Sequence, residues 1–320
     1  MRIVSLLPSA TEILFALGFD SEIVGVSHEC DFPPAARSKQ VMIQSRIPKH
    51  APPAEIDRLV REYVSRGESL YAVDVQALEE LNPDLIITQD LCHVCAASPD
   101  DLGAALARFP QRPEVLCLNP QDLGDVWRDI LWVGEETGRG RAAETLLEQI
   151  GERLGRLEEA LAGAADASAK MPRVAFLEWL QPFYVGGHWV PEMIALAGGQ
   201  DILGRVHTPS FRVTLEEIVA AKPEVILISP CGYDARKARD EYLAMQHREE
   251  WNAIPAVQNC RVYALEASGY FSRPGPRLVT GLETIAKLFH PAIEVTPEAE
   301  HAFFPITFRN TAHRSKAASI

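Results

Sequence analysis

The sequence lacks any apolar run of the length that crosses a membrane, about 18 uninterrupted residues, so we expect no membrane insertion. It is also poor in positive charge: 31 lysines and arginines stand against 44 aspartates and glutamates, a formal net charge of −13. No stretch of the 320 residues gathers the basic side chains that a polyanion requires. Nucleic acid is therefore not an expected partner.

The motifs of several nucleotide-binding and catalytic sites are absent as well. The chain has no G-x-x-x-x-G-K-[ST], no H-E-x-x-H, no G-x-S-x-G and no D-x-H-x-x-G. One G-x-G-x-x-A lies at residues 138–143, but it leads into a charged helix rather than out of a strand, so it is better interpreted as a helix start. We expect no nucleotide cofactor, no catalytic residues and no enzymatic activity.

The N-terminus resembles a secretory signal only superficially. Arg2 precedes an apolar run, but Pro8, Ser9 and Thr11 interrupt that run. Glu12 places a charge in its middle, and no small-x-small cleavage pattern follows. We interpret the segment as a strand, turn and helix of the mature fold and expect a cytoplasmic protein, or an extracytoplasmic one if the start codon is misassigned. Six cysteines would then be reduced thiols.

The two halves of the chain repeat the same order of apolar and polar residues. In each half a strand-like segment precedes a helix-like segment that runs from a glutamate to a glycine six residues later. Further on, a helix ends at a proline before an apolar strand. This order favours a parallel sheet with right-handed crossovers in each half. The paired segments are residues 2–7 and 173–177, 12–18 and 192–198, 22–25 and 201–204, and 75–87 and 215–227.

Residues 141–161 lie between the halves and carry an apolar residue every three or four positions, with charges on the opposite face. At about 1.5 Å per residue such a helix is roughly 30 Å long. We therefore predict an α/β fold of two lobes, each with a mostly parallel sheet flanked by helices, joined by one long rigid backbone helix. The predicted units are an N-terminal lobe over residues 1–120, a linking helical segment over 121–165, a C-terminal lobe over 166–290 and a C-terminal extension over 291–320.

Residues that follow the predicted strands are the candidates for a binding site, because ligands of parallel sheets bind beyond the carboxyl ends of the strands. They are polar and rich in sulfur in the first half and aromatic in the second, which predicts an inter-lobe cleft for a large planar apolar ligand. For any single aromatic, packing in a lobe core explains it equally well. The candidates are Pro8, Ser9, His28, Cys30, Gln89, Cys92, His93 and Cys95 in the first half, and Glu178, Trp179, Phe183, Tyr184, Tyr233, Tyr270 and Phe271 in the second.

Residues 92–95 read Cys-His-x-Cys and leave three interpretations open. A structural zinc site takes four ligands from two paired knuckles, and the His-x-Cys at residues 28–30 has a different spacing. A redox pair would lie at a helix start, but the predicted cap at Ser98 comes three residues later. The third interpretation is contact with, or soft ligation of, a metal carried by the ligand. Any metal would be held by Cys92, His93 and Cys95.

Several blocks of the sequence resemble the substrate-binding proteins of cobalamin and ferric-siderophore ABC importers. Residues 3–18 and 78–87 show the resemblance, as do the glycine pairs at 186–187 and 198–199, the block 222–226 and the Arg-Pro-x-Pro-Arg run at 273–277. The resemblance covers residues 1–290. The cobalamin branch fits best, through the Asp-Phe-Pro-Pro at residues 31–34. It implies two α/β lobes bridged by one helix.

The resemblance also implies a ligand, a partner and their contacts. The ligand would be a corrinoid, cobalamin or a precursor, held between the lobes of a monomer by Trp179, Phe183, Tyr233 and Phe271. A ferric chelate is the alternative that Arg273 and Arg277 would suit, and a metal- or thiol-dependent enzyme on the same fold is another. The partner would be an ABC permease, whose arginines would meet Asp100 or Asp101 of the first lobe and Glu216 of the second.

Overall fold

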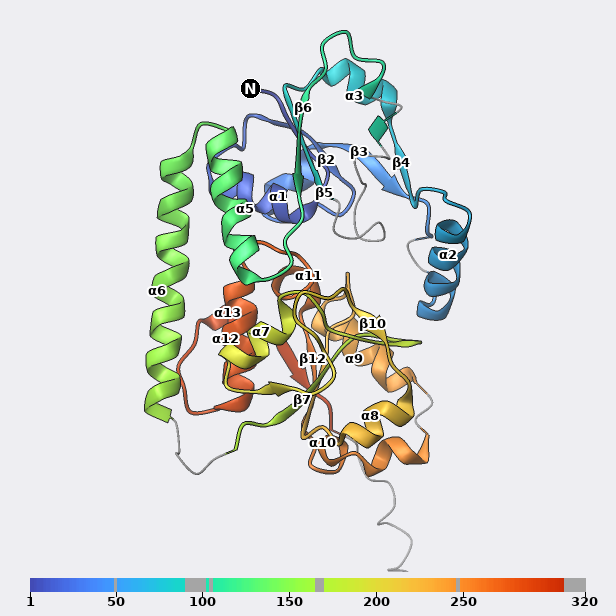
Figure 1. Ribbon diagram of the computed structural model, residues 1–320, viewed down its shortest axis with the longest axis vertical. Coiled ribbons are helices and arrows are strands. Elements are labelled where there is room, and N and C mark those ends of the chain that lie inside the picture. Colours follow the sequence, from blue (N-terminus) through green and yellow to red (C-terminus); the bar gives the residue numbers. More distant parts are fainter. Residues whose placement is uncertain (49–50, 90–101, 104–105, 165–169, 246–247, 308–320) are drawn as a thin grey trace, which may run out of the picture.

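The computed structural model describes residues 1–48, 51–89, 102–103, 106–164, 170–245 and 248–307. Figure 1 shows two lobes stacked along the long axis of the molecule, with one long helix along one side and a shorter helix, α2, on the other. Within the described residues, no helix combines the length and apolar character that spanning a bilayer requires. The predicted site residues Cys92, His93, Cys95, Asp100 and Asp101 lie outside the described residues.

The N-terminal lobe is built on a six-stranded sheet with the strand order β4-β3-β2-β1-β5-β6. All neighbours are parallel except β3 and β4. Its central strands are apolar and buried, as expected for a parallel sheet covered on both faces. The elements are β1 (Ile3–Ser5), α1 (Pro8–Ala16), β2 (Ile23–Ser27), η1 (Pro34–Ser38), β3 (Gln40–Ser45), α2 (Pro53–Ser65), β4 (Tyr71–Val73), α3 (Val75–Leu81), β5 (Leu85–Gln89) and β6 (Glu114–Leu118).

The C-terminal lobe contains a seven-stranded sheet in the order β10-β8-β7-β11-β12-β13, with β9 beside β7. Its strands are β7 (Arg173–Leu180), β8 (Phe183–Val185), β9 (Gln200–Asp201), β10 (Phe211–Arg212), β11 (Val225–Ile228), β12 (Val262–Leu265) and β13 (Phe303–Pro305). Its helices are α7 (Val190–Leu196), α8 (Leu215–Ala221), α9 (Ala235–Ala244), η2 (Glu249–Ala253), α10 (Pro255–Gln258), α11 (Ala267–Tyr270), α12 (Leu278–Phe289) and α13 (Pro297–Glu300). The predicted two-lobe α/β fold is confirmed.

Two details of the C-terminal lobe differ from the prediction. The sheet is mixed, because β7 continues past residue 177 and turns directly into antiparallel β8, so that Trp179 pairs with Tyr184. The segment after residue 290, predicted as an extension, supplies β13, which pairs antiparallel with β12. The lobe therefore includes the described residues up to 307.

The predicted repeat is visible where α3 and α8 each lead into a buried strand. Asn82 and Lys222 end these helices in the left-handed conformation, with φ of 41° and 48°, and a proline follows each. The halves differ between the second strand and this helix. In the C-terminal lobe, the segment before α8 is a short loop with β10. In the N-terminal lobe, the segment before α3 contains β3, α2 and β4.

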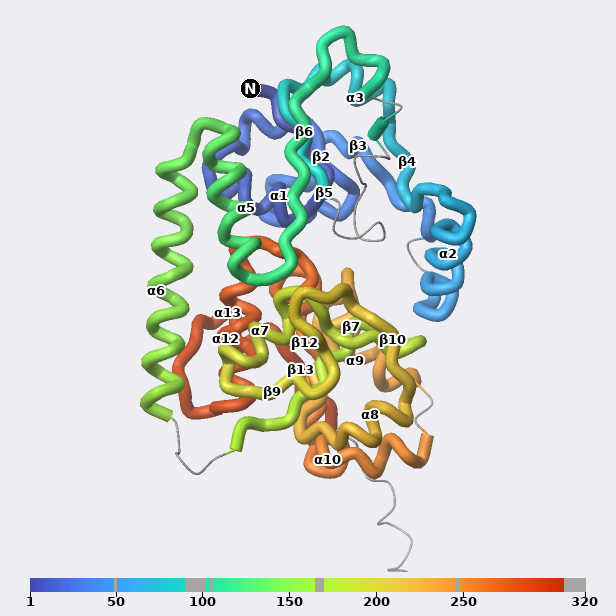
Figure 2. The backbone as a smooth tube through the Cα atoms, viewed as in Figure 1, coloured from blue at the N-terminus to red at the C-terminus, as the bar shows by residue number. Residues whose placement is uncertain are grey.

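The helix α6 (Gly140–Ala164) joins the lobes and forms part of both cores. Ile150 packs in the core of the N-terminal lobe and Leu157 in that of the C-terminal lobe, while Leu154 touches both. Arg153 pairs with Glu283 of α12 at 2.8 Å. The linking segment also holds α5 (Leu123–Glu136), which lies beside α6 in Figure 2. The predicted backbone helix is confirmed.

A cluster of charged side chains ties the lobes together across their facing edges. Arg277 of the C-terminal lobe makes a two-pronged contact with the Glu12 carboxylate, with N–O distances of 2.6 and 2.8 Å. Arg273 pairs with Asp31 at 2.6 Å and donates to the backbone oxygen of Glu29 at 2.9 Å. We call Glu12, Glu29, Asp31, Arg273 and Arg277 the inter-lobe charge cluster.

The interior of the cluster is almost free of solvent. The Glu12 side chain is 3% exposed, and burial raises its pKa although the Arg277 guanidinium opposes the shift. Arg273 is also buried, and its partners lie in the opposite lobe. The sequence predicted Arg273 as a ligand contact. In the structure its guanidinium is occupied by the inter-lobe charge cluster instead, because the loop after β2 places carboxylates opposite it.

Replacing Arg277 with methionine tests the contribution of the inter-lobe charge cluster. The variant leaves the buried Glu12 carboxylate without its two-pronged partner, which costs about 3–5 kcal/mol of folding free energy in comparable cases. Urea unfolding at neutral pH measures the loss. Arg156→Ala is the matched control on α6, because its pair with Glu152 is exposed and 3.9 Å long, and it should change stability by less than about 0.5 kcal/mol.

The cost of Arg277→Met should also depend on pH. Burial already raises the pKa of Glu12, and removal of the guanidinium raises it further. A carboxyl with a higher pKa in the folded than in the unfolded chain lowers stability as the pH rises above its unfolded pKa. The variant should therefore lose more stability at pH 8 than at pH 5. A loss below about 1 kcal/mol at both pH values, as for an exposed pair, would contradict this account.

Candidate functional site

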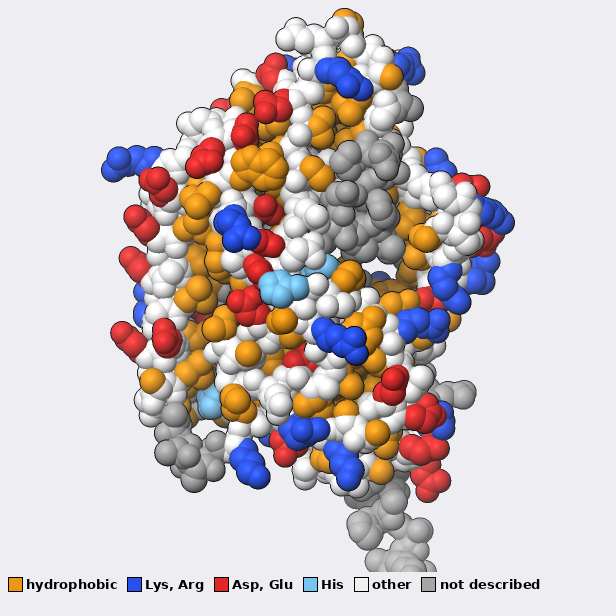
Figure 3. Space-filling model, in the orientation of Figure 1, with side chains coloured by type: hydrophobic (Ala, Val, Ile, Leu, Met, Phe, Trp, Pro, Cys, Tyr) orange, Lys and Arg blue, Asp and Glu red, His pale blue; other side chains and the backbone are white. Residues whose placement is uncertain are grey.

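The carboxyl ends of both sheets face each other, as the contact of Arg273 after β12 with Asp31 after β2 shows. Three further contacts connect the facing edges. Tyr184 of β8 donates to Asp57 of α2 at 3.3 Å. The backbone N–H of Leu123 donates to Glu192 at 3.0 Å, and His207 lies 3.4 Å from Asp122. Figure 3 shows the surface hollowed between the α2 side and the C-terminal lobe.

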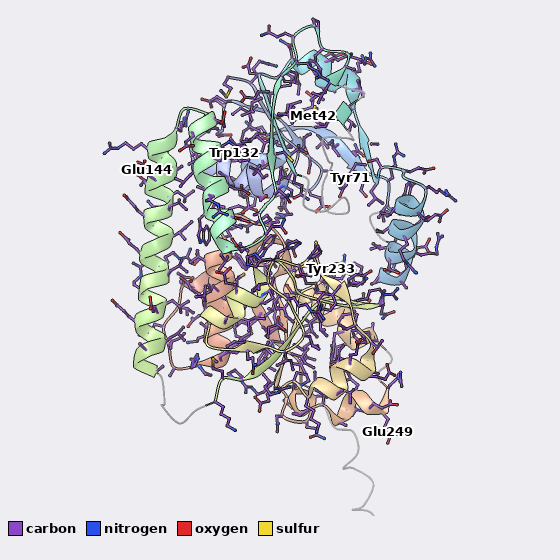
Figure 4. All side chains as sticks on the ribbon, in the orientation of Figure 1. Met42, Tyr71, Trp132, Glu144, Tyr233 and Glu249 are labelled. Carbon is purple, nitrogen blue, oxygen red and sulfur yellow. The ribbon has the colours of Figure 1, made fainter. Side chains whose placement is uncertain are left out.

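Trp179 and Tyr233 lie side by side at this edge of the C-terminal lobe. Their ring centroids are 5.6 Å apart at 62°, and the Trp179 indole N–H donates to the Gln181 oxygen at 3.2 Å. Trp179 is half-buried, whereas Tyr233 is buried and burial raises its pKa to about 12. The Lys237 ammonium lies 3.6 Å from the centre of the Tyr233 ring. Figure 4 places Tyr233 on the side of its lobe that faces the other lobe.

Phe183 and Tyr184 of β8 continue the same edge. Phe183 is half-buried and stacks on the buried ring of Trp251, with centroids 5.5 Å apart and planes at 5°. One face of Phe183 therefore belongs to the core of the lobe. Tyr184 is half-buried and reaches α2 of the other lobe through its hydroxyl. We call Trp179, Phe183, Tyr184 and Tyr233 the aromatic wall.

Phe271 was predicted at this edge, but the structure places it in the core. Its side chain is 2% exposed and packs on Phe176 at 5.4 Å, and its backbone oxygen accepts a hydrogen bond from the Trp189 indole at 2.8 Å. The reason is that α11 follows β12 directly and turns the residue inward. Tyr270 stays half-buried, 5.5 Å from the Arg277 guanidinium.

The candidates near the start of the N-terminal lobe are largely covered. Ser9 is 2% exposed, and Gly275 of the opposite lobe lies so near that a Cβ there would meet Ser9 at 3.7 Å. Pro8 beside it is half-buried. The Cys30 thiol is buried in the core, accepts a hydrogen bond from Thr11 at 3.0 Å and has its pKa raised by burial. Cys30 is therefore a core thiol rather than a nucleophile or soft ligand.

His28 keeps an accessible imidazole at the same edge. Its Nδ1 lies 3.1 Å from the Ile43 oxygen, its Nε2 lies 3.5 Å from Glu29, and the side chain is 26% exposed. The ring also packs at a tilt on Tyr71, with centroids 6.2 Å apart. The contact at Nδ1 fixes the ring, and Nε2 is directed toward the Glu29 carboxylate at the partly exposed side of the residue.

Gln89 of the N-terminal lobe and Glu178 of the C-terminal lobe both lie near the carboxyl ends of strands. Gln89 closes β5 and is 5% exposed. Glu178 belongs to β7 and is half-buried, and it accepts a hydrogen bond from the Ser210 hydroxyl. Across the described ranges, no three His, Cys, Asp or Glu side chains come together in a geometry that could hold a metal ion.

Sequence reasoning missed two residues at the site, Asp57 and Lys237. Asp57 is buried on α2, between the half-buried Ile56 and Val60. A carboxylate inside the apolar stripe of an amphipathic helix was the available signal. Lys237 follows the α9 cap Asp234, in the helix turn where a cation opposes the helix dipole. That unfavourable position was the signal for Lys237.

The predicted docking residue Glu216 lies in the first turn of α8, at the outer end of the C-terminal lobe. Its side chain is 67% exposed and pairs with Arg248 at 2.8 Å. In the repeated helix α3 the matching position carries Gln76, which is neutral. The first turn of α8 is therefore acidic, whereas in α3 the acidic residue at the helix start is the N-cap Asp74.

Comparison with curated proteins finds distant relatives over almost the whole chain. The chain is 26% identical to an uncharacterised ABC transporter substrate-binding lipoprotein, YvrC, of Bacillus subtilis over 300 residues, covering 91% of this chain and 80% of the relative. It is 24% identical to a vitamin B12-binding protein of Vibrio cholerae over 289 residues, covering 89% and 87%.

Solved structures share the fold. A periplasmic heme-binding protein from Pseudomonas aeruginosa superposes with a TM-score of 0.69 at 20% identity, covering 92% of this chain and 94% of that one. The periplasmic vitamin B12-binding protein of Vibrio cholerae gives 0.65 at 22% identity, covering 90% and 96%. The sequence pattern of the family described as "Periplasmic binding protein" matches residues 3–268, well over half of the chain. The protein therefore belongs to the periplasmic binding protein family, a family of substrate-binding proteins and not of enzymes.

Proposed function

We propose that the protein binds a corrinoid, cobalamin or a precursor, in the cleft between its lobes. The observation that carries the proposal is the half-buried Trp179 ring, set against Tyr233 at the edge of the C-terminal lobe that faces the N-terminal lobe (Figure 4). Relatives named vitamin B12-binding protein support it. A corrin ring is broad and largely apolar on its faces, so aromatic side chains suit one face and an imidazole suits the cobalt.

The positive charge of Lys237 suits the phosphate that a corrinoid with a nucleotide loop carries. The Lys237 ammonium beside Tyr233 is exposed and could pair with the phosphate of the cobalamin nucleotide loop. A ferric chelate would use the cations Arg273 and Arg277. Both are already paired with carboxylates of the inter-lobe charge cluster. This arrangement favours a corrinoid over an iron chelate whose binding depends on arginines.

Haem is the second candidate, and His28 is the observation that favours it. Haem needs an axial ligand from the protein, and the His28 side chain is 26% exposed at the facing edge of the N-terminal lobe. A solved relative is named as a heme-binding protein. Cobalamin brings its own lower ligand, so a corrinoid would not depend on His28 to the same degree. This difference separates the two ligands by experiment.

The protein would deliver its ligand to an ABC permease, with Glu216 at the contact. A relative named as an ABC transporter substrate-binding lipoprotein supports such a partner. It also supports a location outside the cytoplasm, as does the periplasmic vitamin B12-binding protein of known structure. The cytoplasmic location expected from the sequence finds no support among these relatives, and we propose an extracytoplasmic one. The second docking position, Asp100 or Asp101, stays a prediction.

Titration of the purified protein with hydroxocobalamin, dicyanocobinamide and hemin tests the ligand. We expect saturable changes in corrin absorption with one corrinoid per chain and dissociation constants in the micromolar range or tighter. Hemin should bind at least about tenfold more weakly, which corresponds to about 1.4 kcal/mol. His28→Ala provides the second arm: corrinoid affinity should change less than hemin affinity.

Two outcomes would overturn the corrinoid proposal. The first is the absence of any spectral change at high micromolar corrinoid. The second is tight hemin binding, with a Soret band that shifts in His28→Ala, together with weak corrinoid binding.

Trp179→Ala should weaken corrinoid binding about tenfold or more, because a buried aromatic contact at the centre of an interface commonly contributes 2 kcal/mol or more. The matched control is Trp132→Ala: Trp132 lies on α5, is 40% exposed and projects away from the facing edges (Figure 4). Isothermal titration calorimetry with both variants measures the effect. Equal affinities for the two variants would remove Trp179 from the site.

Glu216→Arg should lower corrinoid uptake by cells that carry the variant gene at its own locus, while the purified variant keeps its corrinoid affinity. The reason is that an arginine in place of the exposed carboxylate repels a basic permease surface. Glu144→Arg on α6, which Figure 4 shows on the outer side of the molecule, makes the same charge change and should leave uptake intact. Equal uptake in both strains would exclude Glu216 from docking.

A further inference from the structure

The helix α2 is the part of the N-terminal lobe for which the C-terminal lobe has no counterpart. The repeat pairs α3 with α8 and β5 with β11, but the interval before α8 contains only a loop and β10 among the described elements. Figure 1 shows α2 leaving the body of its lobe and descending beside the C-terminal lobe, on the side opposite α6. The two lobes are therefore spanned by α6 on one side and by α2 on the other.

The burial pattern of α2 is unusual for a helix on an α/β lobe. None of its apolar side chains is fully buried, although Val60 and Tyr63 touch the core of the lobe. Ile56 and Leu59 are half-buried and Val64 is 56% exposed. An amphipathic helix in a lobe normally buries its apolar stripe. This one keeps that stripe only partly covered, beside a cleft.

Ion pairs along its own surface support α2 where core packing does not. Arg58 pairs with Glu55 and Glu62, each at 2.7 Å, and Arg66 pairs with Glu62 at 2.6 Å. Such pairs contribute only tenths of a kcal/mol each, and a 13-residue helix is marginal in water by itself. The helix can therefore move or unfold at a lower cost than the elements of either sheet.

The buried side chain of α2 is Asp57, a carboxylate with one partner on α2 and one on the other lobe. The Tyr184 hydroxyl donates to Asp57 Oδ1 at 3.3 Å, and Arg61 pairs with Oδ2 at 2.8 Å. Burial and the Asp57 charge raise the pKa of Tyr184, so the phenol keeps its proton and remains a donor. This hydrogen bond connects α2 with the aromatic wall.

We propose that α2 is a lid over the ligand cleft, that the Asp57–Tyr184 hydrogen bond is its latch, and that Ile56 and Leu59 supply an apolar rim against the bound corrinoid. The inference rests on the proposed function. The ligand enters when the latch opens and is retained when it closes, because α2 spans the open side of the cleft. Asp57 and Tyr184 are thus positioning residues that set the rates of binding and release.

Tyr184→Phe removes the donor of the latch and Asp57→Asn weakens the latch by removing the charge of its acceptor, and both changes preserve side-chain shape. Stopped-flow absorption with hydroxocobalamin should show faster association and a dissociation rate higher by up to about ten- to a hundredfold, the range expected for one hydrogen bond to a charged group. Amide hydrogen exchange over residues 53–65, without ligand, should be faster in both variants. Tyr263→Phe on β12 is the matched control, since its ring packs on Phe303 away from the cleft, and it should leave both readouts unchanged.

The readouts separate this inference from the proposed function. If the wild-type protein binds a corrinoid and both latch variants keep its rates and its exchange pattern, the lid is refuted and the function stands. If no corrinoid binds, the function fails, and exchange alone decides the latch: faster exchange over residues 53–65 supports it and unchanged exchange refutes it. A lower melting temperature with unchanged rates would also refute it, since that would mark a purely structural contact.

Discussion

The relation between the lobes depends on the inter-lobe charge cluster. Arg277 and Arg273 reach from the C-terminal lobe into a set of carboxylates on the N-terminal lobe, and the Glu12 carboxylate at its centre is almost fully buried. A buried charge that loses its partner costs several kcal/mol, so the lobes cannot separate cheaply at this edge. The facing edges of the two sheets are therefore held at a fixed distance.

The helix α6 adds a second restraint, because it takes part in the cores of both lobes. A cleft between two lobes that are fixed in this way is largely formed before the ligand arrives. The Asp57–Tyr184 hydrogen bond that holds α2 is worth about 1.5–3 kcal/mol, against about 3–5 kcal/mol for breaking the buried ion pair. The weaker connection is the one expected to open, so access to the cleft depends on α2 rather than on a hinge between the lobes.

The sequence predicted those features that follow from local patterns. The stripe along residues 141–161 predicted the bridging helix, and the proline after Asn82 and Lys222 predicted where two helices end and buried strands begin. The strand ends also led to Trp179 and Tyr233. The predictions of these helices and strands succeeded because helix periodicity, helix stops and strand polarity are local in sequence, whereas the role of Trp179 and Tyr233 in binding stays a prediction.

The misses came from contacts between distant segments. Phe271 follows a strand, but α11 turns it into the core, and β13 joins the sheet through pairing with a strand 40 residues earlier in the chain. Arg273 looks like a ligand contact until the carboxylates of the other lobe are placed opposite it. Asp57 and Tyr184 are 127 residues apart, and nothing local connects them. Such contacts depend on how distant segments and the two lobes pack against each other, which the local sequence pattern does not specify.

A crystal structure of the protein with bound hydroxocobalamin tests the central claim most directly. The account predicts a corrin ring between the lobes, one face against Trp179, with the Arg277–Glu12 and Arg273–Asp31 pairs intact and α2 closed over the open side. A corrin bound outside the cleft, or lobes that have separated with the inter-lobe charge cluster broken, would contradict it.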